Sequence, residues 1–263
     1  MKQVLFRALA LCSVVLFSAS VTPAKADPSS DLQETGRLLA ILLDSGRVTI
    51  GLNQALINNP SQADQRFTAE TFANQTLSNF KERTGIDLRN LSGAPVPAMA
   101  KPLLERLMEE SKKTVTSYQP VLSMPSMKYK GLIPATFGTE TSERFQKWSG
   151  VYLKQTAPPH LLRNPKNKPD EFEAAYMEQL SRAEVPRTGD GIVSETVEDG
   201  KTVRVLLPLF YSKACLSCHG EPKGERDISG YPREGAKEGE LGGVLSVRLS
   251  ANAQSSPAAE QSR

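Results

Sequence analysis

The sequence predicts an α+β fold, with a helical N-terminal half followed by a small antiparallel sheet. Three observations support this prediction. The run LLAILL at residues 38–43 places leucines at i, i+1, i+4 and i+5, which gives one apolar stripe along a helix. Alternating runs flank Asp199-Gly200, a dipeptide typical of hairpin turns. The stretch LGGVLSVRLS at residues 241–250 has the composition of a further strand.

Residues 1–26 have the pattern of a secretory leader. Lys2 and Arg7 supply positive charge, an apolar run follows, and Ala24-Lys25-Ala26 ends the segment with small residues, as at a cleavage site. The apolar run is short for a membrane span, which needs about 20 residues. We therefore expect cleavage and export, with no stable membrane span afterwards. The small and polar residues 251–263 predict a disordered tail.

Cleavage of the leader changes the charge and the cysteine content. The chain has a formal net charge of +3, and the leader carries three basic residues and no acidic one, so the charge falls to zero. A neutral chain has no polybasic surface to attract nucleic acid or a membrane. Cys12 is removed with the leader, which leaves Cys215 and Cys218 in a compartment where thiols tend to be oxidised.

The first half of the chain contains an internal repeat. The segment beginning at Leu38 aligns without a gap on the segment beginning at Leu103, an offset of 65 residues. The alignment predicts two copies, residues 38–90 and 103–155. Each copy is expected to contain a helix, a break, a second helix that ends at a glycine, and a short extended piece.

A proline-rich linker after the first copy predicts a division of the chain. We expect an N-terminal helical repeat copy at residues 27–97 and a second domain at residues 98–250. Turn signals then lead to a predicted helix at residues 170–180, and the hairpin and last strand complete the sheet.

Chemistry is expected at Cys215-Leu216-Ser217-Cys218-His219, because Cys-x-x-Cys-His is the attachment signal of covalent haem. Two thiols one turn apart can add to the two vinyl groups of the porphyrin. The next histidine then reaches the iron as its proximal ligand. We predict one covalent haem c, bound through Cys215 and Cys218, with His219 on the iron.

Three other kinds of site share parts of this pattern. A redox-active Cys-x-x-Cys favours a thioredoxin-like βαβ setting and a lowered thiol pKa, whereas an antiparallel hairpin and a glycine-rich loop flank the motif here. A structural zinc site needs four ligands, which Cys215, Cys218, His219 and His160 would just supply. A disulfide across two intervening residues would close a tight and strained loop.

The runs VYLKQTAPPHLLRNPKNKPDEFE and VLLPLFYSKACLSCHGEPKG, with the closing glycine-rich strand, resemble the Tll0287-like (DUF3365) family of exported c-type haem proteins. The resemblance covers about residues 100–250 and is most specific at Arg163-Asn164-Pro165 and from Pro208 to Gly220. It implies a PAS-like fold, in which a small antiparallel sheet is flanked by helices and haem packs against it. The N-terminal copy departs from the compact family pattern.

The sixth iron ligand decides between functions, because a strong ligand favours electron transfer and an open position favours small-molecule binding. Met124 and Met127, at the break between the helices of the second copy, are candidates, as is His160, the only other histidine. An open or water-ligated iron is the further alternative. Ordinary packing would equally account for the methionines, and an exposed loop for His160.

Arg163 is a candidate for contact with a haem propionate, because its planar guanidinium matches a carboxylate with two parallel hydrogen bonds. Shaping of the Arg-Asn-Pro turn is the alternative role for this residue.

Three classes of function remain open. We expect electron transfer or redox chemistry first, and second a haem-based sensor or small-ligand binding module without its own output domain. A peroxidase-like enzyme comes last, because no distal His-Arg pair with a recognisable spacing is present. The expected partner is a redox protein or a small gaseous ligand, and the expected location is the periplasm or another exported compartment.

Overall fold

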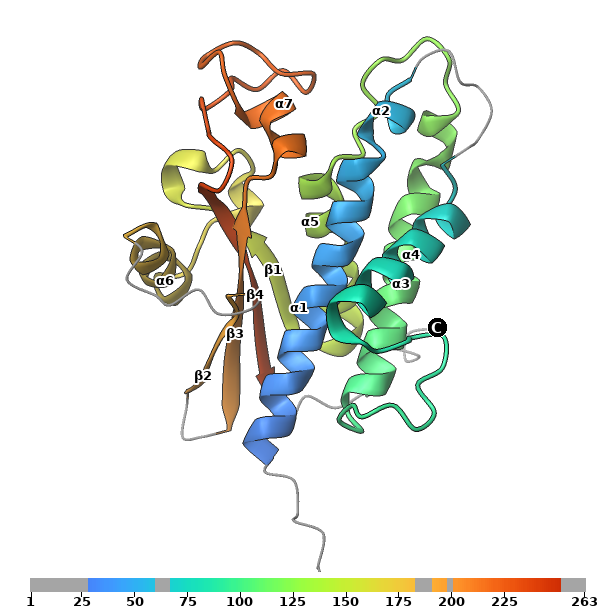
Figure 1. The fold of residues 1–263 in the computed structure, drawn as a ribbon, viewed down its shortest axis with the longest axis vertical. Helices are drawn as coiled ribbons and strands as arrows, with labels where there is room; N and C mark the ends of the chain where they lie inside the picture. Colours follow the sequence, from blue (N-terminus) through green and yellow to red (C-terminus); the bar gives the residue numbers. More distant parts are fainter. Residues whose placement is uncertain (1–27, 60–66, 183–190, 198–200, 252–263) are drawn as a thin grey trace, which may run out of the picture.

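The computed structural model describes residues 28–59, 67–182, 191–197 and 201–251. Within them the predicted α+β class is confirmed, with seven α-helices around one four-stranded antiparallel sheet (Figure 1). No helix in these ranges combines the length and the apolar character needed to cross a membrane. The predicted leader, the break at Pro60-Ser61, the Asp199-Gly200 turn and the tail beyond residue 251 lie outside the described residues.

The sheet has the strand order β1-β4-β3-β2, and each neighbouring pair is antiparallel. Strands β2 (Val193–Val197) and β3 (Thr202–Phe210) form the predicted hairpin, and β4 (Leu241–Ser250) is the predicted last strand. Strand β1 (Tyr152–Thr156) comes from the end of the second repeat copy and pairs with β4. The repeat region therefore contributes an edge strand to the sheet.

Both faces of β3 are covered, which explains why its first seven residues are buried. Val205 and its neighbours at alternate positions point into the core shared with the large helices, whereas Leu206 packs with Tyr176 of α6 (Glu171–Ser181). Helix α6 begins with a capping box between Asp170 and Glu173, and it matches the predicted helix at residues 170–180.

The helices follow the 65-residue offset predicted from the sequence. Adding 65 to the bounds of α3 gives those of α5, and both helices end at a glycine in the left-handed conformation, Gly85 with φ 75° and Gly150 with φ 70°. Residues 35–57 of α1 and α2 correspond in the same way to α4. The bounds are α1 Pro28–Leu52, α2 Gln54–Ile57, α3 Ala69–Thr84, α4 Ala100–Leu122 and α5 Pro134–Ser149.

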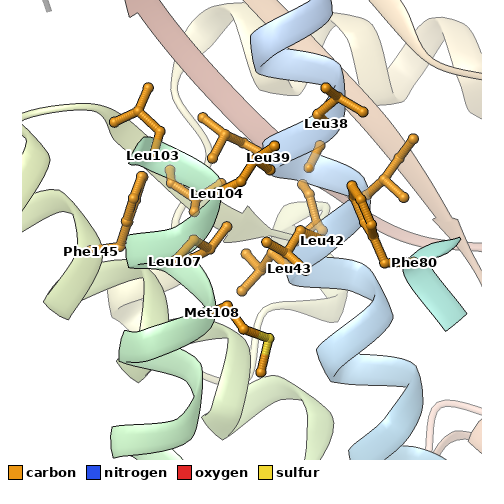
Figure 2. Close-up of a cluster of buried hydrophobic side chains, with 14 of the residues drawn as sticks. Leu38, Leu39, Leu42, Leu43, Phe80, Leu103, Leu104, Leu107, Met108 and Phe145 are labelled. Atoms are coloured by element: carbon orange, nitrogen blue, oxygen red, sulfur yellow. The ribbon is translucent and has the colours of Figure 1, made fainter. Parts of the chain in front are cut away.

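Matched residues of the two copies meet in one hydrophobic core. Phe72 and Phe137, which are 65 positions apart, have ring centroids only 5.1 Å apart. Eight further matched pairs of this core are buried in both copies. Figure 2 labels five of them: Leu38 with Leu103, Leu39 with Leu104, Leu42 with Leu107, Leu43 with Met108 and Phe80 with Phe145.

Each copy also has an equivalent hydrogen bond between its own two helices. The Thr76 hydroxyl donates to the Thr49 hydroxyl at 3.1 Å, and Thr141 donates to Thr114 at 3.0 Å. All four side chains are buried. The offset therefore relates hydrogen bonds as well as helix boundaries.

The prediction of an extended piece in the first copy is wrong. Residues 86–90 form a turn, in which the Asp87 carboxylate accepts a hydrogen bond from the backbone N–H of Arg89 at 3.0 Å. The matching segment of the second copy becomes β1 because β4 offers it an edge to pair with.

Helix α1 packs directly on the sheet. A Cβ atom at Gly36 would come within 2.6 Å of Cγ2 of Val205, so the missing side chain allows the close approach. As a result, α1, α3, α4, α5 and the inner faces of β3 and β4 contribute to one core. The division between residues 97 and 98 stays a prediction, although described residues on both sides of it share this core.

Candidate functional site

The motif lies on an excursion between two neighbouring strands. Residues 211–240 leave the end of β3 and return to the start of β4, and Tyr211 closes the base with backbone hydrogen bonds of 2.8 and 2.9 Å to the residues just before β4. The 3-10 turn η3 (Lys213–Cys215) and helix α7 (Leu216–His219) follow at one end of the sheet (Figure 1). The ends of β3 and β4 thus anchor both ends of the segment that carries the motif.

The two cysteines lie three residues apart on this short helical stretch, and both are partly exposed free thiols. The chain turns sharply after the motif. A Cβ atom at Gly220 would come within 2.7 Å of the Leu216 carbonyl oxygen, which already accepts the Gly220 backbone N–H at 2.9 Å. A glycine is therefore needed directly behind the motif.

His219 has its ring fixed on two sides. Its Nδ1 lies 2.9 Å from Oε2 of Glu234, and the ring packs on Tyr211 with centroids 4.9 Å apart. An ionised carboxylate only accepts hydrogen bonds, so Nδ1 carries the proton and Nε2 keeps its lone pair for a metal. Burial and the nearby Arg163 cation lower the pKa of His219, although its hydrogen bond to Glu234 works against them.

Arg163 connects the excursion to the segment before α6. Its Nε and Nη2 donate to the two oxygens of Glu234 at 2.8 and 3.0 Å, and its Nη1 donates to Asp227 at 2.7 Å. Nη2 also donates to the carbonyl oxygen of Cys218 at 3.0 Å. One guanidinium therefore binds the partner of His219 and the backbone of the motif together.

Both carboxylates that hold Arg163 are ionised. Burial raises the pKa of Glu234, but hydrogen bonds from Arg163 and His219 outweigh it and hold that pKa below its usual value. Burial likewise raises the pKa of Asp227, and bonds from Ser229 and Arg163 reverse the shift. Asp227 thus ties the loop after the motif to Arg163.

A family model, described as Tll0287-like, matches residues 33–250. The chain belongs to the Tll0287-like family. Among solved structures, the cyanobacterial heme-protein Tll0287 is similar, with 18% sequence identity, a TM-score of 0.39, and coverage of 58% of this chain and 92% of that one. No curated protein matches. The family match includes the whole first repeat copy, residues 38–90, and so reaches further than the resemblance seen in the sequence.

The residues of this Tll0287-like chain fit a haem in their donor set and in their apolar surroundings. A neutral imidazole with a free Nε2 follows two thiols on one helical turn. Six large apolar side chains are exposed among the described residues, and all come from segments at the end of the molecule that carries α7 (Figure 1). They are Val48 and Leu52 of α1, Met124 and Met127 between α4 and α5, and Ile228 and Tyr231 after α7.

The candidates for the distal side differ in their setting. Met124 and Met127 are 45% and 39% exposed on the segment between α4 and α5. The same segment carries Tyr129. Burial raises the pKa of Tyr129 most, and the electrostatic effect of the nearby Asp227 and Cys218 raises it further. His160 is exposed in the 3-10 turn η1 (Pro159–Leu161). Iron ligation by any of them stays a prediction.

The alternatives to haem find less support in this family member. Burial raises the pKa of the Cys218 thiol, whereas a redox-active cysteine needs a lowered one. The fold around the motif is antiparallel rather than βαβ. In the described part of the chain, no three His, Cys, Asp or Glu side chains are arranged to hold a metal ion, so the four residues of the zinc alternative do not come together.

The propionate contact of Arg163 stays a prediction, since its guanidinium is held by two carboxylates of the protein itself. Sequence reasoning missed Glu234, Asp227 and Tyr211. One signal could have located Glu234, since a ligating histidine commonly donates its second ring N–H to a carboxylate. Several acidic residues follow His219 before β4, however, and no spacing rule distinguishes Glu234 from the others.

Proposed function

We propose that this protein is an exported c-type haem protein that acts in electron transfer or redox chemistry through one covalent haem. Cys215 and Cys218 carry the thioether bonds, and His219 is the proximal iron ligand. Two findings support the proposal: membership of the Tll0287-like family, and the single Cys-x-x-Cys-His motif of the chain.

The observation that carries the proposal is the state of His219. A histidine that serves as an iron ligand must be neutral, with one nitrogen free and the other held. Glu234 binds Nδ1 at 2.9 Å, and burial lowers the pKa of the ring, so Nε2 is free at neutral pH. The two cysteines directly before it are the groups that attach a porphyrin.

The bound haem would supply a one-electron couple, and the protein's own residues do the rest. His219 would hold the iron, Glu234 orients the His219 ring, and the exposed apolar side chains at the end of the molecule that carries α7 would exclude water from the porphyrin. A site without large motions suits electron transfer, and the backbone hydrogen bonds between Tyr211 and residues 239–240 hold the two ends of the excursion together.

Three further parts complete the proposal. A PAS-like description is supported by a small antiparallel sheet with helices on both faces. Export is supported by the leader pattern of residues 1–26. The partner is a redox protein, or a small gaseous ligand if the protein is a sensor instead.

Covalent haem is tested by mass. We expect the wild-type chain, produced in a host that matures c-type cytochromes, to keep the mass of one haem after acid-acetone extraction. The double variant Cys215→Ala/Cys218→Ala is expected to lose it, because no thiol remains to form the thioether bonds. An unmodified wild-type mass under these conditions would reject the proposal.

Carbon monoxide separates electron transfer from sensing. We expect the reduced wild type to resist carbon monoxide, because a strong sixth ligand blocks the iron. One of the variants Met124→Ala, Met127→Ala and His160→Ala should then bind it, as followed by the optical spectrum. Rapid binding by the wild type would favour the sensor. Resistance in all three variants would exclude all three side chains as ligand.

A further inference from the structure

We propose that Arg163 is a positioning residue which acts through Glu234 to fix the ring tautomer of His219 and to moderate its electron donation to the iron. The inference rests on the proposed function, in which His219 is the proximal ligand. It assigns to Arg163 a role that is separate from any contact with a propionate.

The geometry makes Glu234 the shared element. Nε and Nη2 of Arg163 donate to the two carboxylate oxygens at 2.8 and 3.0 Å, a bidentate pair that restricts rotation of the carboxylate. The oxygen that Nη2 binds is also the one 2.9 Å from Nδ1 of His219. With its carboxylate unable to rotate, Glu234 presents a fixed acceptor to the imidazole, and this selects the tautomer with a proton on Nδ1.

The Arg163 guanidinium also determines where the Glu234 carboxylate lies relative to the motif. Nη2 of Arg163 donates to the Cys218 carbonyl oxygen at 3.0 Å, which ties Arg163 to the residue directly before His219. Asp227 holds the opposite edge, and its own side chain is fully buried and accepts further bonds from Ser229 and Tyr231. The Arg163 side chain is itself only 19% exposed. Through Arg163, the Glu234 carboxylate is therefore tied both to the Cys218 backbone and to the buried Asp227.

The two residues are expected to act on the iron in opposite directions. A carboxylate on Nδ1 increases electron donation by the imidazole and so stabilises oxidised iron, which lowers the reduction potential. Arg163 draws part of the negative charge of Glu234 to itself and adds a positive charge, so it raises the potential. General loosening of the site would move both variants in the same direction, whereas this arrangement predicts opposite signs.

The first experiment measures the reduction potential of the haem-loaded protein. We expect Glu234→Gln to raise the potential and Arg163→Gln to lower it, each by about tenfold in the redox equilibrium, or about 59 mV for one electron. Arg163→Lys, which keeps the charge but not the fork, should lie between wild type and Arg163→Gln. The controls are Glu178→Gln and Arg182→Gln, an exposed Glu–Arg ion pair at the end of α6, outside the 211–240 excursion. Shifts of the same sign, or shifts no larger than the controls, would overturn the proposal.

The second experiment needs no haem. The chain has only two histidines, so ¹⁵N-histidine labelling of the full-length Cys215→Ala/Cys218→Ala variant gives two ring spin systems in an NMR spectrum. We expect His219 to be a neutral Nδ1–H tautomer there, and to become a mixture of tautomers in Glu234→Ala and, less completely, in Arg163→Gln. His160 should stay unchanged in both.

The two experiments separate the possible failures. Absence of covalent haem from the wild type would reject the proposed function, while the NMR spectrum would still report whether Arg163 and Glu234 fix the tautomer. Haem-loaded protein in which Glu234→Ala leaves the His219 tautomer unaltered would reject the positioning role and leave the proposed function standing.

Discussion

Replacing His219 with glycine is expected to leave haem attached through Cys215 and Cys218 while removing the proximal ligand of the iron. The iron should lose its low-spin spectrum, because the imidazole supplied by α7 is the ligand that the fold holds in place. Added imidazole should restore much of the wild-type spectrum by filling the space left by the ring. Optical spectra of both oxidation states, with and without imidazole, measure this.

The other histidine provides the matched control. His160 is exposed in η1, and His160→Gly should leave the proximal side intact and give no rescue by imidazole like that of His219→Gly. A His219→Gly protein with an unchanged spectrum would show that another residue ligates the iron on this side. A complete loss of haem from this variant alone would show that the histidine is needed for attachment rather than only for ligation.

Replacing Glu173 with alanine is expected to lower the free energy of unfolding more than any other substitution considered above. Its fully buried carboxylate lies 2.9 Å from Nζ of Lys154 and 2.9 Å from the Tyr152 hydroxyl, and it faces the buried Arg204 at 3.5 Å. Removal of the carboxylate leaves two cations beneath α6 with too little negative charge to balance them. Breaking a buried pair in this way costs about 3–5 kcal/mol.

The free energy of unfolding from urea titrations tests this expectation. Glu171→Ala is the matched control, since that residue lies in the same first turn of α6 but is exposed. Its effect should stay within about 0.5 kcal/mol, as is usual for surface substitutions. If the two variants lose similar free energy of unfolding, the buried contacts of Glu173 stabilise the fold no more than an exposed residue of the same helical turn does.

Local patterns predicted most of the secondary structure. The alternation around residues 199–200 predicted the β2–β3 hairpin, and the turn signals before Asp170 predicted the start of α6. The 65-residue offset anticipated the bounds of α3 and α5, which agree to the residue. It failed at residues 86–90, because whether an extended segment becomes a strand depends on a free edge beside it rather than on its own composition.

In the candidate site, too, residues close together in the chain were predicted and contacts between distant residues were not. Cys215, Cys218 and His219 were predicted because their chemistry depends on close spacing along the chain, which a sequence records directly. Arg163 was singled out by its residue type, but its partners were not, since Glu234 lies 71 residues away along the chain. The fold alone brings them within hydrogen-bond distance.

The sequence by itself determined the fold class, the repeat and the Cys-x-x-Cys-His motif, because each depends on residue type and local spacing. Only the tertiary structure decided that the two copies share one core, that β1 completes the sheet, and that Arg163 and Glu234 stand behind His219. The physical reason is that these features depend on contacts between segments far apart in the chain. Such contacts form where packing of α1 on the sheet and closure of the 211–240 excursion bring the segments together.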